Sequence, residues 1–154
     1  MKKHYGRRIH MLQRGMDQTM TNALASMELT AAQGRIMGYI AHRPKPPCPR
    51  DIEDEFRLSH PTVSGILSRL EKKGFIELRP DEQDRRCKRI YILEKGHACT
   101  ELMHQTIRNN ENQMVSGFTP EELEVFSAFL DRAITNMGIS LCCPKHKEDE
   151  ITND

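Results

Sequence analysis

The sequence has no long hydrophobic run, and this absence argues against a membrane protein. None of its apolar stretches approaches the ~18 residues that a membrane-spanning helix needs. The opening Met1-Lys-Lys leads into a polar amphipathic segment rather than into the apolar core of a secretory signal. We therefore expect a cytoplasmic protein.

Motifs of the common enzyme classes are missing as well. The chain contains no phosphate-binding glycine loop, no nucleophile-elbow pattern and no His-Glu-x-x-His. The sequence therefore gives no reason to expect an enzyme, and it predicts no cofactor.

Cysteine is present without the pattern of a disulfide framework or of a zinc site. The five cysteines are an odd set without regular spacing, and the cytosol keeps thiols reduced. Cys142 and Cys143 are adjacent, so they lack the Cys-x-x-Cys geometry of structural zinc sites. We expect reduced, free cysteines and no metal ion.

The formal charge of +1 is unevenly distributed along the chain. Between Arg57 and Lys95, ten basic and six acidic residues give a net charge of +4, so the rest of the chain carries −3. A basic segment on a mildly acidic body is typical of a surface that binds a polyanion, although it is also common on ordinary solvated surfaces.

Helical periodicity is found on both sides of the basic segment. Apolar residues recur at helical spacing over residues 5–27, and Thr30 with Gln33 forms a capping-box pattern that opens a second helix. That helix should end at the prolines of residues 44–49. A long helix is expected after Lys95-Gly96.

A second capping-box pattern, Thr119 with Glu122, should open the last helix. Its apolar side chains recur at helical spacing and are expected to point inward. They are Leu123, Phe126, Leu130, Ala133, Ile134 and Met137.

The basic segment itself is predicted to form two short helices and a two-stranded ribbon. Pro49 suits the first turn of one helix, Ser59 is a good N-cap for the next, and Gly74 is a good stop. In that second helix Val63, Ile66, Leu67 and Leu70 form a core-facing stripe. A strand from Phe75 to Pro80 and a return strand over 90–93 should flank a charged, projecting loop over 81–88.

This arrangement is that of a winged helix-turn-helix, in which one helix enters the major groove of DNA and a basic ribbon reaches the backbone or the adjacent groove. Small polar residues on the outer helix face allow close approach to base edges. We expect Asp84 to pair with Arg86 and so to fix its guanidinium for minor-groove insertion. The predicted DNA-binding residues are Ser59, His60, Thr62, Ser64, Ser68, Arg69, Asp84, Arg85, Arg86 and Lys88.

The segments Leu58-Ser59-His60-Pro61-Thr62-Val63-Ser64, Arg69-Leu70-Glu71-Lys72-Lys73-Gly74-Phe75-Ile76 and Asp84-Arg85-Arg86 resemble the MarR family of bacterial transcriptional regulators. The resemblance spans roughly residues 29–137. It implies a mainly α fold with a small antiparallel β wing, in which Asp84 and Arg86 form the wing signature and Arg86 reads the minor groove. It also implies a homodimer that binds pseudo-palindromic double-stranded DNA.

The resemblance implies a division of the chain into four parts. Residues 1–29 would be an N-terminal dimerisation helix, 30–95 the winged helix-turn-helix DNA-binding domain, 96–138 the C-terminal dimerisation helices and 139–154 a polar, frayed tail. Members of the family usually respond to a small amphipathic or phenolic ligand, so we expect a repressor that such a ligand releases from DNA. The sequence does not identify the ligand-binding residues.

Two alternatives remain open. Cys87 lies in the predicted wing beside Arg86 and Lys88, where positive charge would favour a thiolate, so the protein could be a redox-responsive regulator of the same fold. It could also be an architectural DNA-binding module that uses this fold without effector control.

Overall fold

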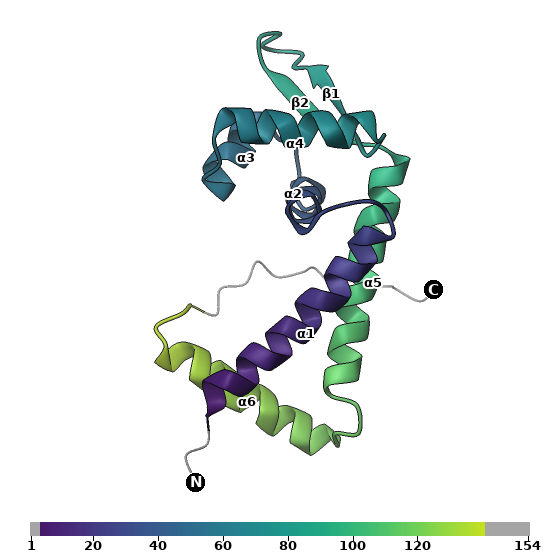
Figure 1. Ribbon diagram of the computed structural model, residues 1–154. Coiled ribbons are helices and arrows are strands. Elements are labelled where there is room, and N and C mark those ends of the chain that lie inside the picture. Colours follow the sequence, from purple (N-terminus) through teal and green to yellow (C-terminus); the bar gives the residue numbers. More distant parts are fainter. Residues whose placement is uncertain (1–3, 141–154) are drawn as a thin grey trace, which may run out of the picture. The chain divides into compact units, whose positions relative to one another are not determined.

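The computed structural model describes residues 4–140 and divides the chain into two compact units, residues 1–112 and 113–154. No helix within the described residues is long and apolar enough to span a membrane. The mainly helical fold with one small antiparallel sheet is as predicted (Figure 1). In chain order the elements are α1 (Tyr5–Ala25), α2 (Ala31–Ala41), α3 (Pro49–Phe56), α4 (His60–Lys72), β1 (Ile76–Pro80), β2 (Lys88–Ile92), α5 (Glu94–Met114) and α6 (Pro120–Asn136).

The first unit has a hydrophobic core to which nearly all of its elements contribute. Helix α2 contributes Ile36, Met37 and Ile40, which are at most 4% exposed. The predicted stripe of α4 packs against it, with Val63, Leu67 and Leu70 buried and Ile66 partly buried. The core is completed by Leu24, Leu29, Ile52, Phe75, Ile76, Ile90 and Cys99. Burial of this apolar area is the main force that holds the helices and the sheet together.

Local signals set the ends of the helices. The Thr30 hydroxyl accepts a hydrogen bond from the Gln33 amide at 3.2 Å, and the Gln33 side chain returns the contact, which confirms the predicted capping box. Gly74 follows α4 with a φ of +78°, a left-handed conformation that favours glycine. One cap was not predicted: the Asp51 carboxylate accepts a hydrogen bond from the Cys48 amide at 2.8 Å and so fixes the start of α3.

The sheet is an antiparallel pair in which Ile76 lies opposite Ile92 and Pro80 lies opposite Lys88. The proline loop, residues 43–48, is attached to the middle of β2, because the Ile90 amide donates to the Pro47 carbonyl at 2.9 Å. The return strand begins at Lys88, earlier than predicted, so the connecting loop is limited to residues 81–87. The charged side chains of Lys88 and Arg89 suggested a loop, but both residues pair with β1 in the sheet.

Helix α5 also begins earlier than predicted, at Glu94 instead of after Gly96. Gly96 is buried in its first turn, where an added Cβ would lie only 2.3 Å from the Phe75 carbonyl oxygen. The glycine therefore allows α5 to pass close to the Phe75 carbonyl at the base of the sheet. It lies inside α5 and does not mark the helix boundary that the sequence suggested. The buried face of α5 is formed by Gly96, Cys99 and Thr100, with Met103 partly buried beside them.

The second unit contains α6 behind the predicted Thr119–Glu122 capping box. None of the described residues of α6 is buried. Leu123, Phe126 and Ile134 of the predicted inward set are half-buried, whereas Leu130 and Met137 are 38% and 77% exposed. A single copy of the chain therefore leaves much of this apolar face uncovered. The predicted frayed tail, with Cys142 and Cys143, lies mostly outside the described residues.

Candidate nucleic-acid interface

Helix α4 has one buried and one outward face. Its N-cap, Ser59, accepts a hydrogen bond from the Thr62 amide at 3.4 Å, and the two hydroxyl groups lie 2.8 Å apart. The stripe of Val63, Leu67 and Leu70 faces the core, so the residues between them must face out. This local pattern presents the predicted contact residues on one side of the unit.

The outward face is small and polar. Thr62, Ser64 and Arg69 are exposed, and Ser68 is half-buried. Thr62 and Arg69 also line a shallow cavity of about 370 Å³ between α4 and the start of α2, which contributes Thr30 and Gln33. The structure therefore brings the predicted α4 residues together on one surface, with an open hollow along one flank.

Gly65 and Lys72 belong to this face and were not predicted as contact residues. A Cβ added to Gly65 would meet nothing within 4 Å, so the fold does not require glycine there. Lys72 is exposed one helical turn beyond Ser68. The i, i+4 spacing from Ser64 through Ser68 to Lys72 is the sequence signal that would have identified the lysine.

His60 is engaged within the protein. Its Nδ1 lies 2.6 Å from a carboxylate oxygen of Glu53 on α3. The Glu53 side chain is only 22% exposed. The contact ties the start of α4 to α3 and leaves Nε2 as the ring nitrogen that can face a partner.

The wing loop is organised around Asp81. One oxygen of its carboxylate accepts from the amides of Gln83 and Asp84, at 2.7 and 3.3 Å, and the other accepts from the Arg89 guanidinium. The Arg89 hydrogen bond, followed by these amide contacts, lowers the pKa of Asp81. The loop is therefore held by a carboxylate that stays ionised at neutral pH.

The expected pair between Asp84 and the guanidinium of Arg86 is not formed. The Asp84 carboxylate instead accepts from the backbone amide of Arg86 at 3.0 Å, a local turn contact that is typical of aspartate. Asp84 therefore shapes the backbone that carries Arg86 and does not fix its side chain.

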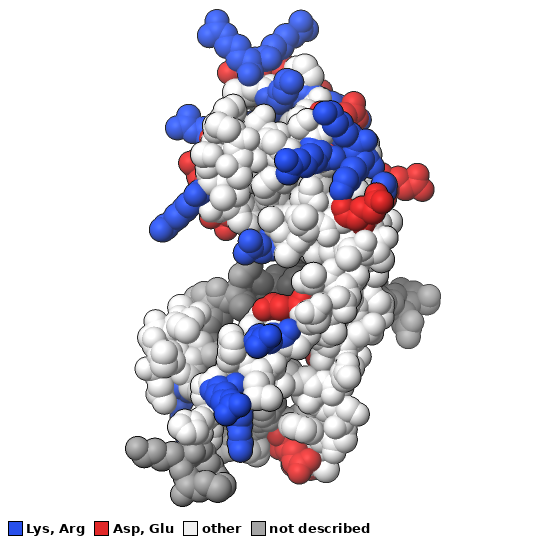
Figure 2. Space-filling model, viewed as in Figure 1, with Lys and Arg blue, Asp and Glu red and all other residues white. Residues whose placement is uncertain are grey.

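The tip of the wing keeps its cations available. Arg79 is paired with Glu77 at 2.7 Å, and Arg89 is paired with Asp81. Within residues 4–140 the exposed side chains of Arg85, Arg86 and Lys88 form no ion pair or hydrogen bond. In Figure 2 the blue side chains gather at the wing and around α4, on the same unit as the polar helix face.

The Cys87 thiol has a raised pKa, whereas the sequence predicted surroundings that favour the thiolate. Its Sγ lies 3.6 Å from the Asp84 carboxylate, and the negative charge of Asp84 raises the pKa of the thiol, with partial desolvation adding to the effect. The prediction that neighbouring arginines and lysine would favour a thiolate was wrong in direction, because the closest charge is the carboxylate.

Comparison with known proteins gives this surface a context. A sequence profile described as MarR family matches residues 27–86. YybA of Bacillus subtilis, an uncharacterized HTH-type transcriptional regulator, is 28% identical over 131 residues, which are 85% of this chain and 87% of the relative. MepR of S. aureus, a transcription regulator of a multidrug efflux pump, is 28% identical, with a TM-score of 0.79 over 88% of this chain and 99% of that one.

The chain is thus similar to the MarR family in sequence over residues 27–86 and in fold over most of its length. A crystal structure of a MepR–DNA complex is 29% identical to it, with a TM-score of 0.75 over 86% of this chain and 99% of that chain. The predicted winged helix-turn-helix fold is thereby confirmed, and these relatives are transcriptional regulators rather than enzymes. Nine of the ten predicted contact residues, all except Lys88, fall inside the region that the MarR profile matches.

Proposed function

We propose that this chain is a homodimeric, sequence-specific DNA-binding regulator of the MarR family that represses transcription until a small amphipathic or phenolic ligand releases it. The observation that carries the proposal is the joint exposure of the polar α4 face and of the unpaired cations Arg85, Arg86 and Lys88 on one unit. The helix has the size and polarity for the major groove, and the arginines suit the negative potential of a narrow minor groove. The crystal structure of the MepR–DNA complex supports the same use of the fold.

The proposed contact set is the predicted one. Ser59, Thr62, Ser64, Ser68 and Arg69, with His60 through its free ring nitrogen, would contact bases and phosphates from α4. Asp84 would shape the wing turn, and Arg85, Arg86 and Lys88 would contact the backbone or the minor groove. Lys72 extends this set by one helical turn.

The proposed dimer rests on apolar residues that a single chain leaves exposed. On α1, Tyr5, Ile9 and Leu12 are 48–64% exposed at i, i+4, i+7 spacing. On α6, Val125 and Phe129 are 53% and 56% exposed. Apolar stripes of this kind mark protein–protein contacts, and a second copy of the chain would give the two-fold symmetry that pseudo-palindromic DNA requires. In this proposal residues 1–29 and 96–138 serve dimerisation and residues 30–95 serve DNA binding.

Repression follows from position, since a dimer that occupies an operator blocks polymerase. An architectural DNA-binding module is the competing function to be tested. The redox alternative is less favoured, because the Asp84 carboxylate raises the pKa of the Cys87 thiol and so lowers its reactivity at neutral pH.

The decisive experiment is a fluorescence titration of a palindrome from the protein's own promoter against a scrambled duplex at moderate salt. We expect preference for the palindrome, two chains per duplex and a steep salt dependence from phosphate contacts. Equal affinity for both duplexes would contradict the sequence-specific regulator and favour the architectural module.

A matched pair of variants tests the wing. Arg86→Ala should cost on the order of 1–3 kcal/mol of DNA-binding free energy with little change in stability, because the side chain is exposed and unpaired. Arg108→Ala is the control, since it removes an exposed arginine of α5 that pairs with Glu101. Unchanged affinity in Arg86→Ala would remove Arg86 from the contact set.

A further inference from the structure

A histidine–carboxylate contact joins α3 to the first turn of α4. The Nδ1 atom of His60 lies 2.6 Å from a carboxylate oxygen of Glu53, which is seven residues earlier in the chain. His60 is the first residue of α4 after its N-cap, Ser59. The contact therefore places an acidic side chain directly behind a proposed DNA contact.

The two side chains differ in exposure. The His60 side chain is 75% exposed, whereas that of Glu53 is only 22% exposed. The ring is therefore attached to the protein through Nδ1, and Nε2 is the nitrogen that solvent or DNA can reach. A carboxylate that holds one nitrogen of a histidine sets the orientation of the ring and the use of the other nitrogen.

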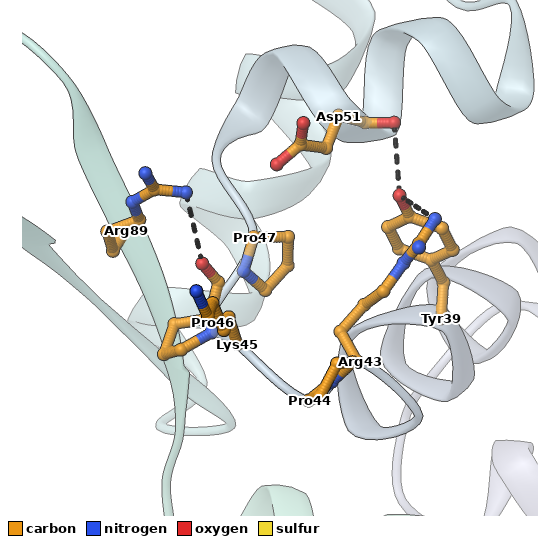
Figure 3. A pocket seen from close by; sticks show the side chains of 8 residues that line it. All are labelled: Tyr39, Arg43, Pro44, Lys45, Pro46, Pro47, Asp51 and Arg89. Carbon is orange, nitrogen blue, oxygen red and sulfur yellow. Dashed lines mark hydrogen bonds between the residues drawn. The ribbon is translucent and has the colours of Figure 1, made fainter.

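Helix α3, which carries Glu53, is fixed at several points. The Tyr39 hydroxyl of α2 donates to the Asp51 backbone carbonyl at 3.4 Å (Figure 3), and the Tyr39 ring packs edge to face against Phe56, with ring centroids 5.6 Å apart. In the turn before α4, the backbone carbonyl of Glu53 accepts from the Leu58 amide at 3.1 Å. A carboxylate on such a fixed backbone can orient the histidine ring at little cost in entropy.

Within residues 4–140, Glu53 is the carboxylate that pairs with His60. Two other acidic side chains near α4 have their own partners, because Asp51 caps the start of α3 and Glu77 of β1 pairs with Arg79. The other charged residues of α2, α3 and the α3 C-cap are all exposed, namely Arg35, Arg50, Asp54, Glu55 and Arg57. The charged residues of α4 itself lie near its C-terminal end, at Arg69, Glu71 and Lys72. Glu53 is therefore the charge that the His60 ring contacts on the protein side.

The protonation state of the ring decides what Nε2 can do. An ionised carboxylate only accepts hydrogen bonds, so Nδ1 must carry the proton that points at Glu53. In a neutral imidazole Nε2 is then a lone pair, which repels a phosphate oxygen. In the imidazolium both nitrogens donate, and Nε2–H can form a charge-assisted hydrogen bond with a phosphate. A phosphate contact at His60 therefore requires a second proton on the ring.

We propose that Glu53 is a positioning residue for DNA binding, which holds the His60 imidazolium through Nδ1 so that Nε2–H donates to a backbone phosphate. When the complex forms at pH 7–8, the ring takes up on the order of one proton per chain, because it then lies between two anions that favour its charged form. The inference rests on the proposed function and extends it, since it assigns a DNA-binding role to an acidic residue.

Glu53→Gln separates this role from simple repulsion. Loss of an acidic residue near DNA ordinarily strengthens binding, because phosphates repel carboxylates. Here Glu53→Gln should instead weaken operator binding on the order of fivefold at pH 6.5, because the neutral amide no longer stabilises the imidazolium. His60→Gln should weaken binding to a similar degree. The double variant should bind no more weakly than His60→Gln, since the two residues act as a unit.

Asp54→Asn is the matched control. Asp54 is the next residue of α3, is exposed and forms no ion pair within residues 4–140. The variant removes the same charge, so its DNA affinity should equal or exceed that of the wild type, with the same pH profile. Thermal unfolding of each variant checks that its fold is intact, and an exposed pair of this kind contributes little to stability.

The experiment is a fluorescence titration of the operator duplex from pH 6 to pH 8 at constant ionic strength. Wild-type affinity should fall on the order of tenfold across this range, and the profile should be flatter in Glu53→Gln and His60→Gln. Parallel profiles of the wild type and Glu53→Gln, or a gain of affinity in Glu53→Gln, would overturn the proposal. Tighter wild-type binding at pH 8 than at pH 6 would overturn it as well, because His60 would then accept a hydrogen bond from a base.

The two proposals can fail separately. Equal affinity for the operator and for a scrambled duplex would contradict the sequence-specific regulator. A phosphate contact does not depend on base sequence. The difference between the pH profiles of the wild type and Glu53→Gln therefore decides the role of Glu53 on either duplex.

Discussion

Gly65 offers the sharpest test of the proposed interface, because stability and DNA binding should change in opposite directions. It lies in the middle of α4, where glycine costs about 0.5–1 kcal/mol relative to alanine through backbone entropy. A Cβ at this position would meet nothing within 4 Å, so no clash offsets the gain. Gly65→Ala should therefore raise the free energy of unfolding by about 0.5–1 kcal/mol.

The same methyl group would project from the outward face between Thr62 and Arg69. If the backbone of α4 approaches base edges closely, the added carbon must separate the two surfaces or displace an ordered water. We expect DNA affinity to fall on the order of tenfold, or about 1.4 kcal/mol. Urea unfolding measures the first effect and a fluorescence titration of the operator duplex measures the second, both at one protein concentration because a dimer's stability depends on it.

Gly15→Ala is the matched control, since Gly15 is also exposed within a helix, α1, and its added Cβ would likewise meet nothing within 4 Å. It should stabilise the protein by a similar amount. Because Gly15 lies in the proposed dimerisation helix, its DNA affinity is measured at a concentration where the variant is dimeric, and it should then match that of the wild type. The reasoning would be refuted if Gly65→Ala and the bulkier Gly65→Gln both bound DNA as tightly as the wild type. The outward face of α4 would then not lie against the bases.

Three further predictions concern stability and thiol chemistry. Gly96→Ala places a Cβ 2.3 Å from the Phe75 carbonyl oxygen, so it should lower the free energy of unfolding by about 1–3 kcal/mol in urea. Wild-type stability in this variant would contradict the close approach of α5 to Phe75. Cys87 should react slowly with iodoacetamide at pH 7–8, because Asp84 raises the pKa of its thiol. Asp84→Asn should speed this reaction, which peptide mass spectrometry can follow. An unchanged rate would argue against the carboxylate as the cause. The pKa of Asp51 is lowered, chiefly by the Cys48 amide, so its cap contributes stability above the unfolded value of 3.8 that is lost as pH falls through the lower folded value. In Asp51→Asn this part of the acid dependence should be reduced in urea unfolding below pH 4, and an unchanged profile would contradict the cap.

Much of the fold could be predicted because its signals are local. The Thr30 and Thr119 capping boxes, the Ser59 N-cap and the Gly74 stop all depend on residues within a few positions of each other, and each lies where the sequence placed it. The buried stripe of α4 follows from helical periodicity, and the unburied residues of that helix then had to form its outer face.

What the sequence could not settle depended on contacts between distant segments. Gly96 resembled a helix boundary, yet it is buried because α5 must pass close to the Phe75 carbonyl. The charged Lys88 was predicted to lie in the loop, yet it pairs with Pro80 and so belongs to the sheet. Strand ends depend on register, which charge patterns do not encode.

The charges of the wing show the same division. The sequence by itself determined that this ribbon is basic and that it follows a helix with a polar outer face, because composition and periodicity are properties of the chain. Only the tertiary structure decided which of these charged side chains form ion pairs or hydrogen bonds within the protein. The Asp81 carboxylate pairs with Arg89. The Asp84 carboxylate accepts hydrogen bonds from the Arg86 backbone amide and from the Cys87 thiol, so the Arg86 side chain is left unpaired. Electrostatic pairing falls off over a few ångströms, so it depends on the folded positions of the side chains rather than on their order in the sequence.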